Sequence, residues 1–223
     1  MKVFNPSSSV HTFFTLLLCV SAVFVSSTID GRFPRIINGK PSSSNNHPFF
    51  ASFLKWNPET KQQIRFCGGS VVGLKWVLTA AHCVEPNLED MKVAVGHIDR
   101  NQSNFIATRS VKNSFLPDGC RGSNELKCDV ALLEMNEPFR HYVQLMNLAR
   151  KKIKIGIEAT AIGYGRTERG MYPNVLLEAH SKVRHCPHGY DDGVVCFGDD
   201  DGNMCHADSG APLFTEDNEG YSW

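Results

Sequence analysis

The sequence predicts an all-β protein, built as a sandwich or a barrel. Its 223 residues are enough for one large β domain or two small ones, and its hydrophobic content of 42% is ordinary for a globular protein. From residue 49 onward the apolar runs are short, and glycine, proline and asparagine interrupt them. Short runs between turn residues favour strands over helices. The chain contains no internal repeat that would suggest another architecture.

Nine apolar runs are the predicted strands of this β structure. They cover residues 49–54, 71–78, 91–95, 105–108, 130–135, 159–162, 175–179, 194–197 and 213–215. The segment 42–46 is polar and is expected to form a surface loop. The last residues, 221–223, are expected to return along the ninth strand as a hairpin.

The N-terminus has the pattern of a secretory signal peptide. A lysine at position 2 precedes an almost wholly apolar or small segment at 11–25, and small residues follow it. We therefore predict a signal peptide at residues 1–27 and a secreted, extracellular mature protein without a membrane segment. An uncleaved anchor is the alternative, but the apolar run is short for a membrane span. Eight cysteines agree with secretion, because cytosolic thiols stay reduced.

The charge balance gives no reason to expect nucleic acid or an anionic membrane as a partner. Lys+Arg and Asp+Glu both number 23, so the formal net charge is zero.

One short motif suggests a covalent modification. Asn101-Gln102-Ser103 is a glycosylation sequon in a polar stretch, and we predict a glycan on Asn101.

Three motifs place a histidine, an aspartate and a serine in that order. His82 lies in WVLTAAHC, Asp129 in CDVALL and Ser209 in CHADSGAPL. A serine hydroxyl needs a base to act as a nucleophile, and a carboxylate can orient an imidazole for that task. Taken singly, the three residues also fit a core histidine, a loop carboxylate and a turn serine. Taken together, the motifs resemble the chymotrypsin-like (trypsin-like) serine protease family.

The resemblance implies a fold and a set of catalytic roles. The fold would be two packed antiparallel six-stranded β-barrels with the active site between them. The peptidase domain would span residues 36–223, with the first barrel at 36–146 and a partial second barrel at 147–223. His82 would be the general base, Asp129 its orienting group and Ser209 the nucleophile that forms an acyl-enzyme. The family needs no cofactor for this chemistry, and none is predicted.

The resemblance also implies activation by proteolysis. Residues 28–35 would be a propeptide, and cleavage after Arg35 would free the α-amino group of Ile36. In the family this ammonium pairs with the aspartate before the catalytic serine, here Asp208. A buried carboxylate needs such a partner, and its arrival would order the neighbouring loop.

Two further features concern the oxyanion hole and the specificity pocket. The family's oxyanion donors fall on the backbone N–H groups of Ala207 and Ser209. The family usually has glycine at positions 207 and 211, so Ala207 and Ala211 raise a question of backbone geometry. Asn203 falls at the pocket position. Because it is neutral, it does not support cleavage after Lys or Arg. The aspartates at 199–201 are interpreted as a solvated loop rather than as a calcium site.

Removal of Cys19 with the signal peptide leaves seven cysteines, which predict three disulfides and leave one cysteine over. The resemblance implies Cys67–Cys83 and Cys186–Cys196, and proximity suggests Cys120–Cys128. Cys205 would normally pair with a downstream cysteine, so the chain is expected to be truncated at its C-terminus and its second barrel incomplete. A zinc site is a weaker interpretation, because disulfides explain the cysteines better. Its ligands would be His185, Cys186, His188, Cys205 and His206.

The sequence therefore predicts a secreted serine endopeptidase zymogen. Its partners would be a protein or peptide substrate and an activating protease. A catalytically impaired homologue that acts as a binding or regulatory protein is the alternative. The alanines near Ser209 are the features that favour it.

Overall fold

The computed structural model describes most of the chain from residue 39 onward. The described residues are 39–43, 47–96, 106–118, 120, 128–140, 143–166, 172–187, 194–198, 208–217 and 220–222. All of them belong to one compact unit, Phe33–Trp223. Within these ranges, no helix is both long enough and apolar enough to cross a bilayer.

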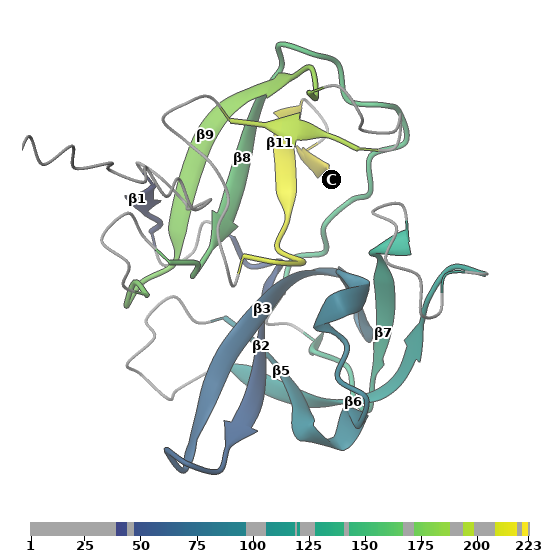
Figure 1. The fold of residues 1–223 in the computed structure, drawn as a ribbon. Helices are drawn as coiled ribbons and strands as arrows, with labels where there is room; N and C mark the ends of the chain where they lie inside the picture. Colours follow the sequence, from purple (N-terminus) through teal and green to yellow (C-terminus); the bar gives the residue numbers. More distant parts are fainter. Residues whose placement is uncertain are drawn as a thin grey trace, which may run out of the picture. The chain divides into compact units, whose positions relative to one another are not determined.

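Six strands close into an antiparallel barrel (Figure 1). They are β2 (Phe50–Asn57), β3 (Gln62–Gly73), β4 (Trp76–Thr79), β5 (Met91–Val95), β6 (Ala107–Phe115) and β7 (Ala131–Met135). Their order around the barrel is β2-β3-β4-β7-β6-β5, so every strand has two neighbours. Closure leaves no open edge for another chain to pair with.

The barrel interior follows from the alternation of side chains along each strand. In β7, the first, third and fifth residues (Ala131, Leu133 and Met135) are buried and the two between them are half-buried. Successive side chains of a strand point to opposite faces, so this pattern turns one face inward. Phe53 and Met91 join the same fully buried cluster. Burial of each such side chain contributes about 1.5–3 kcal/mol of hydrophobic free energy.

The predicted run at 71–78 differs from the structure in its connection. It contains the end of β3 and most of β4, with a turn at Leu74 and Lys75 between them. The residues on both sides of the turn are apolar, so Gly73 and Lys75 were too weak a signal to divide the run. β3 and β6 also extend beyond their predicted runs. Some of the added residues, such as Gln62 and Asn113, are polar and exposed, and pairing with a neighbouring strand rather than burial holds them in the sheet.

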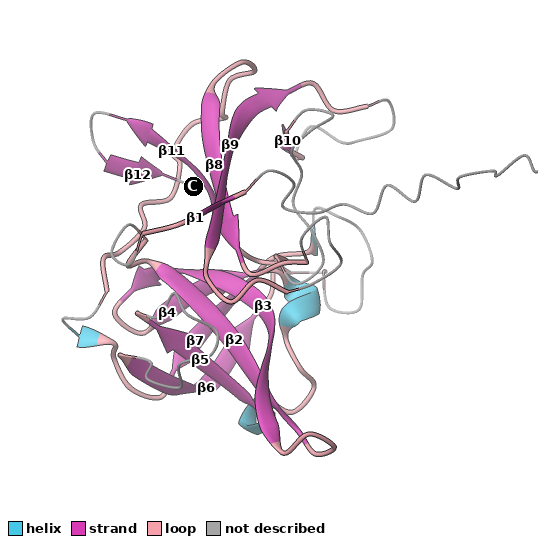
Figure 2. Cartoon of the chain, turned by 90° about the vertical axis from the view of Figure 1, so that its left-hand side faces the viewer, coloured by secondary structure: helices cyan, strands magenta, loops and turns pink. Residues whose placement is uncertain are grey.

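A second group of strands forms a six-stranded sheet (Figure 2). Its path is β1-β9-β8-β11-β12, and β10 pairs with β9 off this path. Its strands are β1 (Lys40–Pro41), β8 (Glu158–Gly163), β9 (Leu177–Arg184), β10 (Cys196–Phe197), β11 (Leu213–Asp217) and β12 (Gly220–Ser222). Over the described residues this sheet stays open. The prediction of an all-β fold is confirmed, with one closed six-stranded barrel and a second sheet.

The two terminal strands of the second sheet, β12 and β1, can be compared with the predicted hairpin and the predicted barrel boundaries. β12 runs antiparallel to β11, as expected for a hairpin. β1 lies in the range 36–146, which was expected to belong to the first barrel, yet it pairs with β9 of the second sheet. Lys40 lies opposite Glu178 in this pairing, and opposite charges at facing positions stabilise strand pairs. Pro41 lacks an N–H and is therefore suited to an edge strand.

Aromatic side chains join the closed barrel to the second sheet. Phe49 directly precedes β2, Phe50 is its first residue, and Phe214 lies in β11. The rings of Phe49 and Phe214 meet edge to face, with their centroids 5.2 Å apart, and both side chains are fully buried. Ile162 of β8 and Ala211 belong to the same buried cluster. This packing fixes the position of β11 and of the loop that leads into it.

Candidate active site

Strand register brings His82 and Asp129 together. Thr79, the last residue of β4, pairs with Ala131, the first residue of β7. His82 follows Thr79 by three residues, in a short 3-10 helix at Ala81–Cys83, and Asp129 precedes Ala131 by two. Because the two strands are antiparallel, the segment that follows β4 and the segment that precedes β7 lie at the same end of the barrel. Residues 47 positions apart in the sequence thus become neighbours.

Both oxygens of the Asp129 carboxylate bind the histidine. Oδ2 lies 2.7 Å from Nδ1 of the His82 ring, and Oδ1 accepts a hydrogen bond of 2.9 Å from the His82 backbone N–H. An ionised carboxylate only accepts hydrogen bonds, so the ring proton belongs on Nδ1. The other ring nitrogen, Nε2, is then left with a lone pair. The His82 side chain as a whole is 55% exposed.

Ser209 lies beside the same part of the barrel. Its carbonyl oxygen accepts a 2.9 Å hydrogen bond from the N–H of Gly68 in β3. The same oxygen lies 3.6 Å from Sγ of Cys83, the residue next to His82. That sulfur belongs to a disulfide and has no proton, so the second distance is a packing contact. A turn closed by the Ala211 N–H and the Asp208 carbonyl carries the serine.

Gly210 allows this turn to approach the barrel closely. Its φ is +74°, a conformation that glycine adopts at little cost. A Cβ at this position would overlap the Thr79 hydroxyl and lie 2.6 Å from the Gly68 carbonyl oxygen. Thr79 in turn donates a 2.8 Å hydrogen bond to that carbonyl. The serine loop is therefore positioned by Gly68 in the middle of β3 and by Thr79 at the end of β4.

Ala211 adopts no strained conformation. Among the described residues, non-glycine residues with positive φ are limited to Lys61 and Arg140. Ala211 is buried. A Cβ added to Gly68 would lie 2.8 Å from the Cβ of Ala211. The methyl group of Ala211 thus occupies space that the glycine of β3 leaves open. The concern about backbone geometry that the sequence raised at Ala211 has no support in this structure.

Asp208 is buried between two glycines that sequence analysis did not single out. Its exposed fraction is 1%, and Oδ1 accepts a 2.7 Å hydrogen bond from the backbone N–H of Gly165. A Cβ on either Gly163 or Gly165 would overlap the carboxylate. The pattern Gly163-Tyr164-Gly165 at the end of a strand was the available signal, since glycine there marks close approach of another group.

The structure contains disulfides at the three pairs considered in the sequence. Cys67–Cys83 crosses beneath the His82 segment, Cys120–Cys128 directly precedes Asp129, and Cys186–Cys196 links the end of β9 to β10. The first two therefore restrain the segments that carry His82 and Asp129. With Cys186 bonded to Cys196, its sulfur is not available to the alternative zinc site.

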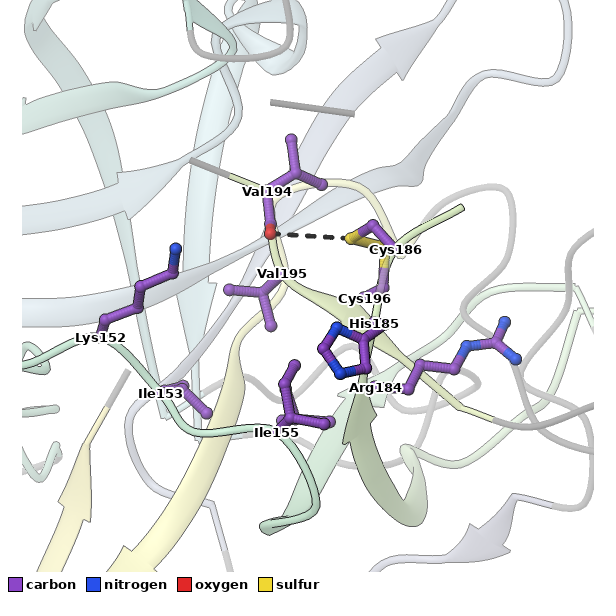
Figure 3. Close-up of a pocket in the computed structure, with 10 residues that line it drawn as sticks. Lys152, Ile153, Ile155, Arg184, His185, Cys186, Val194, Val195 and Cys196 are labelled. Atoms are coloured by element: carbon purple, nitrogen blue, oxygen red, sulfur yellow. Dashed lines mark hydrogen bonds between the residues drawn. A yellow bond between two sulfur atoms is a disulfide. The ribbon is translucent and has the colours of Figure 1, made fainter. Parts of the chain in front are cut away.

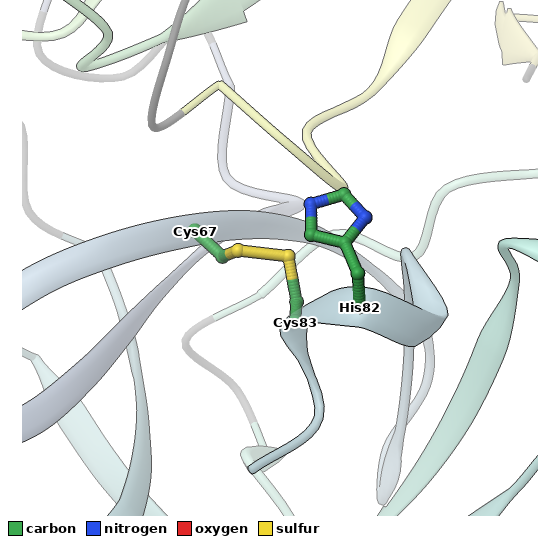
Figure 4. A group of neighbouring side chains, drawn as sticks. All are labelled: Cys67, His82 and Cys83. Atoms are coloured by element: carbon green, nitrogen blue, oxygen red, sulfur yellow. A yellow bond between two sulfur atoms is a disulfide. The ribbon is translucent and has the colours of Figure 1, made fainter. Parts of the chain in front are cut away.

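Cys67, His82 and Cys83 form a cluster that resembles a metal site only in its composition (Figure 4). Their ligand atoms lie within 4.8 Å of one another. Metal binding needs thiolate sulfurs, and here the two sulfurs are bonded to each other. The Nδ1 atom of His82 is paired with Asp129. These donors do not fit a metal ion.

Several predicted residues lie outside the described ranges. They are Arg35 and Ile36 of the predicted activation site, Asn101 of the sequon, Asp199–Asp201, Asn203 of the predicted pocket, Cys205, Ala207 of the predicted oxyanion hole, and His188 and His206 of the alternative zinc site.

The sequence of this chain is similar to those of known serine proteases. The trypsin family matches residues 36–222. Trypsin epsilon of Drosophila erecta is 29% identical, over 91% of this chain and 83% of the relative. Mannan-binding lectin serine protease 1 of Mus musculus is 27% identical, over 85% of this chain and 30% of the relative. Transmembrane protease serine 11G of Rattus norvegicus is 25% identical, over 84% and 47%. The chain thus spans less than half the length of two of these relatives.

Proposed function

Because the chain belongs to the trypsin family of serine proteases, we propose that it is a secreted serine endopeptidase zymogen. The observation that carries the proposal is the double contact between His82 and Asp129, at 2.7 and 2.9 Å. That contact prepares the imidazole to act as a base. The Ser209 backbone packs against the residue next to His82, which supports Ser209 as the nucleophile.

In the proposed reaction, Ser209 attacks the carbonyl carbon of a peptide bond. His82 Nε2 takes the hydroxyl proton as the bond forms and later gives it to the leaving amine. Asp129 holds the ring proton on Nδ1 and stabilises the imidazolium formed in between. Water, activated by the same histidine, then hydrolyses the acyl-enzyme and returns Ser209 to its starting state. No cofactor is needed for these steps.

We assign the oxyanion hole to the backbone N–H groups of Ala207 and Ser209. Alanine has the same N–H group as glycine, so the donor is chemically present. Loss of one such donor costs a factor of about 10²–10³ in rate. Asn203 is proposed as the residue at the base of the specificity pocket, and a neutral amide there favours substrates without a cationic side chain.

Activation is proposed to follow cleavage after Arg35 by another protease. The new ammonium of Ile36 would form an ion pair with Asp208. The burial of Asp208 supports this role, because a buried carboxylate gains most from a cationic partner. The predicted segments, a signal peptide at 1–27 and a propeptide at 28–35, and a glycan on Asn101 belong to the same proposal. The three disulfides support an extracellular location.

Labelling with a fluorophosphonate probe tests the proposed function. The secreted protein, cleaved after Arg35, should form a covalent adduct with one equivalent of probe. The Ser209→Ala variant should form none, and the uncleaved protein should react much more slowly. Thermal unfolding of the variant checks that its fold is intact.

Absence of a Ser209-dependent adduct from a folded, cleaved chain would contradict the enzyme proposal. The protein would then be a family member with a binding or regulatory role. An adduct formed equally well without cleavage would contradict the zymogen proposal alone.

A further inference from the structure

Tyr164 lies between the two glycines that border the Asp208 carboxylate. It directly follows β8, with Gly163 before it and Gly165 after it. The Gly165 N–H donates a 2.7 Å hydrogen bond to Oδ1 of Asp208, and a Cβ on either glycine would overlap the carboxylate. A displacement of Tyr164 would therefore move the backbone that holds Asp208, the residue next to Ser209.

Two residues of the closed barrel contact the buried Tyr164 ring. The ring of Phe50, the first residue of β2, lies with its centroid 5.9 Å from that of Tyr164. The guanidinium carbon of Arg65, in β3, lies over the same ring at 4.5 Å from its centroid. A planar guanidinium is attracted to the negative face of an aromatic ring. Arg65 thus links the barrel to the segment that borders Asp208.

A bulge in β3 lies directly beside Arg65. Phe53 and Leu54 are consecutive in β2, where the register of the two strands shifts. Their partners in β3 are Cys67 and Arg65, with Phe66 between them. A bulge breaks the regular alternation of side chains and changes the direction in which they point. The direction of the arginine is therefore set by the backbone of the barrel.

Strand β3 also holds the serine loop directly. The N–H of Gly68, three residues after Arg65, donates a 2.9 Å hydrogen bond to the Ser209 carbonyl. The strand therefore reaches two consecutive residues of the loop. It contacts Ser209 through its own backbone, and it reaches Asp208 through the ring of Tyr164.

We infer that Arg65 is a positioning residue for the serine loop. Its guanidinium holds the Tyr164 ring, and the backbone on either side of that ring holds Asp208. Because Asp208 directly precedes Ser209, its position sets that of the serine. Displacement of a reacting group by about 1 Å can cost about 10²-fold in rate. The effect on catalysis rests on the proposed function, whereas the effect on Asp208 does not.

The rate of fluorophosphonate labelling tests the catalytic part. It is measured over a range of probe concentrations on the full chain cleaved after Arg35. Arg65→Met keeps an unbranched side chain but removes the cation, and it should lower the maximal labelling rate about fivefold or more. The probe concentration at half-maximal rate should change less than about twofold, because probe binding is not altered. Arg65→Lys keeps a cation over the ring and should lose less than about threefold.

Two other arginines give matched controls. The guanidinium carbon of Arg109 lies 6.0 Å from the ring centroid of Phe139 in the closed barrel, so Arg109→Met also removes a cation from an aromatic ring. Arg184 is exposed and lines a pocket at the end of β9 (Figure 3). Because β9 runs antiparallel to β8, Arg184 lies at the opposite end of β8 from Tyr164. Arg109→Met and Arg184→Met should each change the labelling rate less than about twofold.

Amide hydrogen exchange, followed by NMR, tests the positioning of Asp208 without using the reaction. The Gly165 N–H should exchange faster in Arg65→Met, because the hydrogen bond to Asp208 opens more often. The Val71 N–H of the same strand β3 donates a 2.8 Å hydrogen bond to the Phe49 carbonyl and reports a general loss of stability. The acceleration at Gly165 should exceed that at Val71 at least about fivefold.

Three outcomes would overturn the inference. Unchanged exchange at Gly165 in Arg65→Met would show that the arginine does not hold Asp208. Equal acceleration at Gly165 and Val71 would reduce its role to general stability. Faster exchange at Gly165 with an unchanged labelling rate would show that Ser209 is positioned without it. A parent protein that forms no Ser209-dependent adduct would contradict the proposed function, and the exchange at Gly165 would still decide whether Arg65 holds Asp208.

Discussion

The closed barrel and the second sheet contribute to the candidate site in different ways. The barrel carries His82 and Asp129, and the pairing of β4 with β7 brings them within hydrogen-bond distance. The second sheet carries Ser209 on the loop before β11. That loop depends on contacts across the interface, to Gly68 and Thr79 in the barrel. His82 and Asp129 are thus fixed within one barrel, whereas Ser209 is fixed only where the two parts meet.

The largest expected effect comes from breaking the pair inside the barrel. Asp129→Asn would place an amide donor against Nδ1 and move the ring proton to Nε2, the atom that must act as the base. We expect the rate of fluorophosphonate labelling to fall by about 10⁴-fold without a change in fold, as for other triads of this kind. Glu137→Gln, at an exposed carboxylate of the same barrel, is the control and should have no effect. Retention of a tenth of the activity in Asp129→Asn would refute the assigned role.

A second prediction tests the contacts on the serine side. Gly165→Ala would force a methyl group into the buried Asp208 carboxylate and should lower the free energy of unfolding by about 2–3 kcal/mol. Gly156→Ala is the matched control, because an added Cβ there meets nothing within 4 Å. Its φ of +86° should still cost about 1 kcal/mol. Urea unfolding measures both variants, and equal losses would show that the carboxylate tolerates the methyl group.

A third prediction concerns the edge of the second sheet and its dependence on pH. Glu178 accepts a 2.8 Å hydrogen bond from His47, whose side chain is only 6% exposed. Burial tends to raise the pKa of Glu178, but hydrogen bonds from His47 and Ser42 outweigh it, and the net pKa lies below the usual 4.5. A lowered folded-state pKa stabilises the protein above about pH 4.5, and this contribution is lost as the pH falls through the folded value.

Glu178→Gln should therefore destabilise the protein by about 1–2 kcal/mol at about pH 7, and by less below about pH 4. Urea unfolding of parent and variant at the two pH values measures the difference. A variant that is equally destabilised at both would contradict the link to ionisation of Glu178.

The smallest effect is expected at Ala211. Removing its methyl group with Ala211→Gly should lower stability by about 1 kcal/mol, through lost burial and added chain entropy. The labelling rate of Ser209 should stay within about twofold, since Ala211 is unstrained and packs against Gly68. A tenfold rise in rate would show that alanine at this position impairs the site.

Much of the fold was predictable because local pattern and burial agree. The alternation of buried residues in β7 and the apolar run of β5 mark those strands directly. The first residues of β3 and the last residues of β6 were missed in part because polar, exposed residues such as Gln62 and Asn113 are held there by pairing with neighbouring strands. The separate strand β4 was missed because the one turn-forming residue at this connection, Gly73, is itself the last residue of β3 and apolar residues lie on both sides of it.

The sequence by itself determined the chemical groups of the candidate site, because histidine, aspartate and serine occur in specific motifs that can be recognised without coordinates. Only the tertiary structure decided which atoms meet. The approach of Asp129 to Nδ1 depends on strand register, and the burial of Asp208 depends on the absence of a Cβ at Gly163 and Gly165. These contacts join residues tens of positions apart, and steric fit across such distances is not encoded in any local pattern of residues.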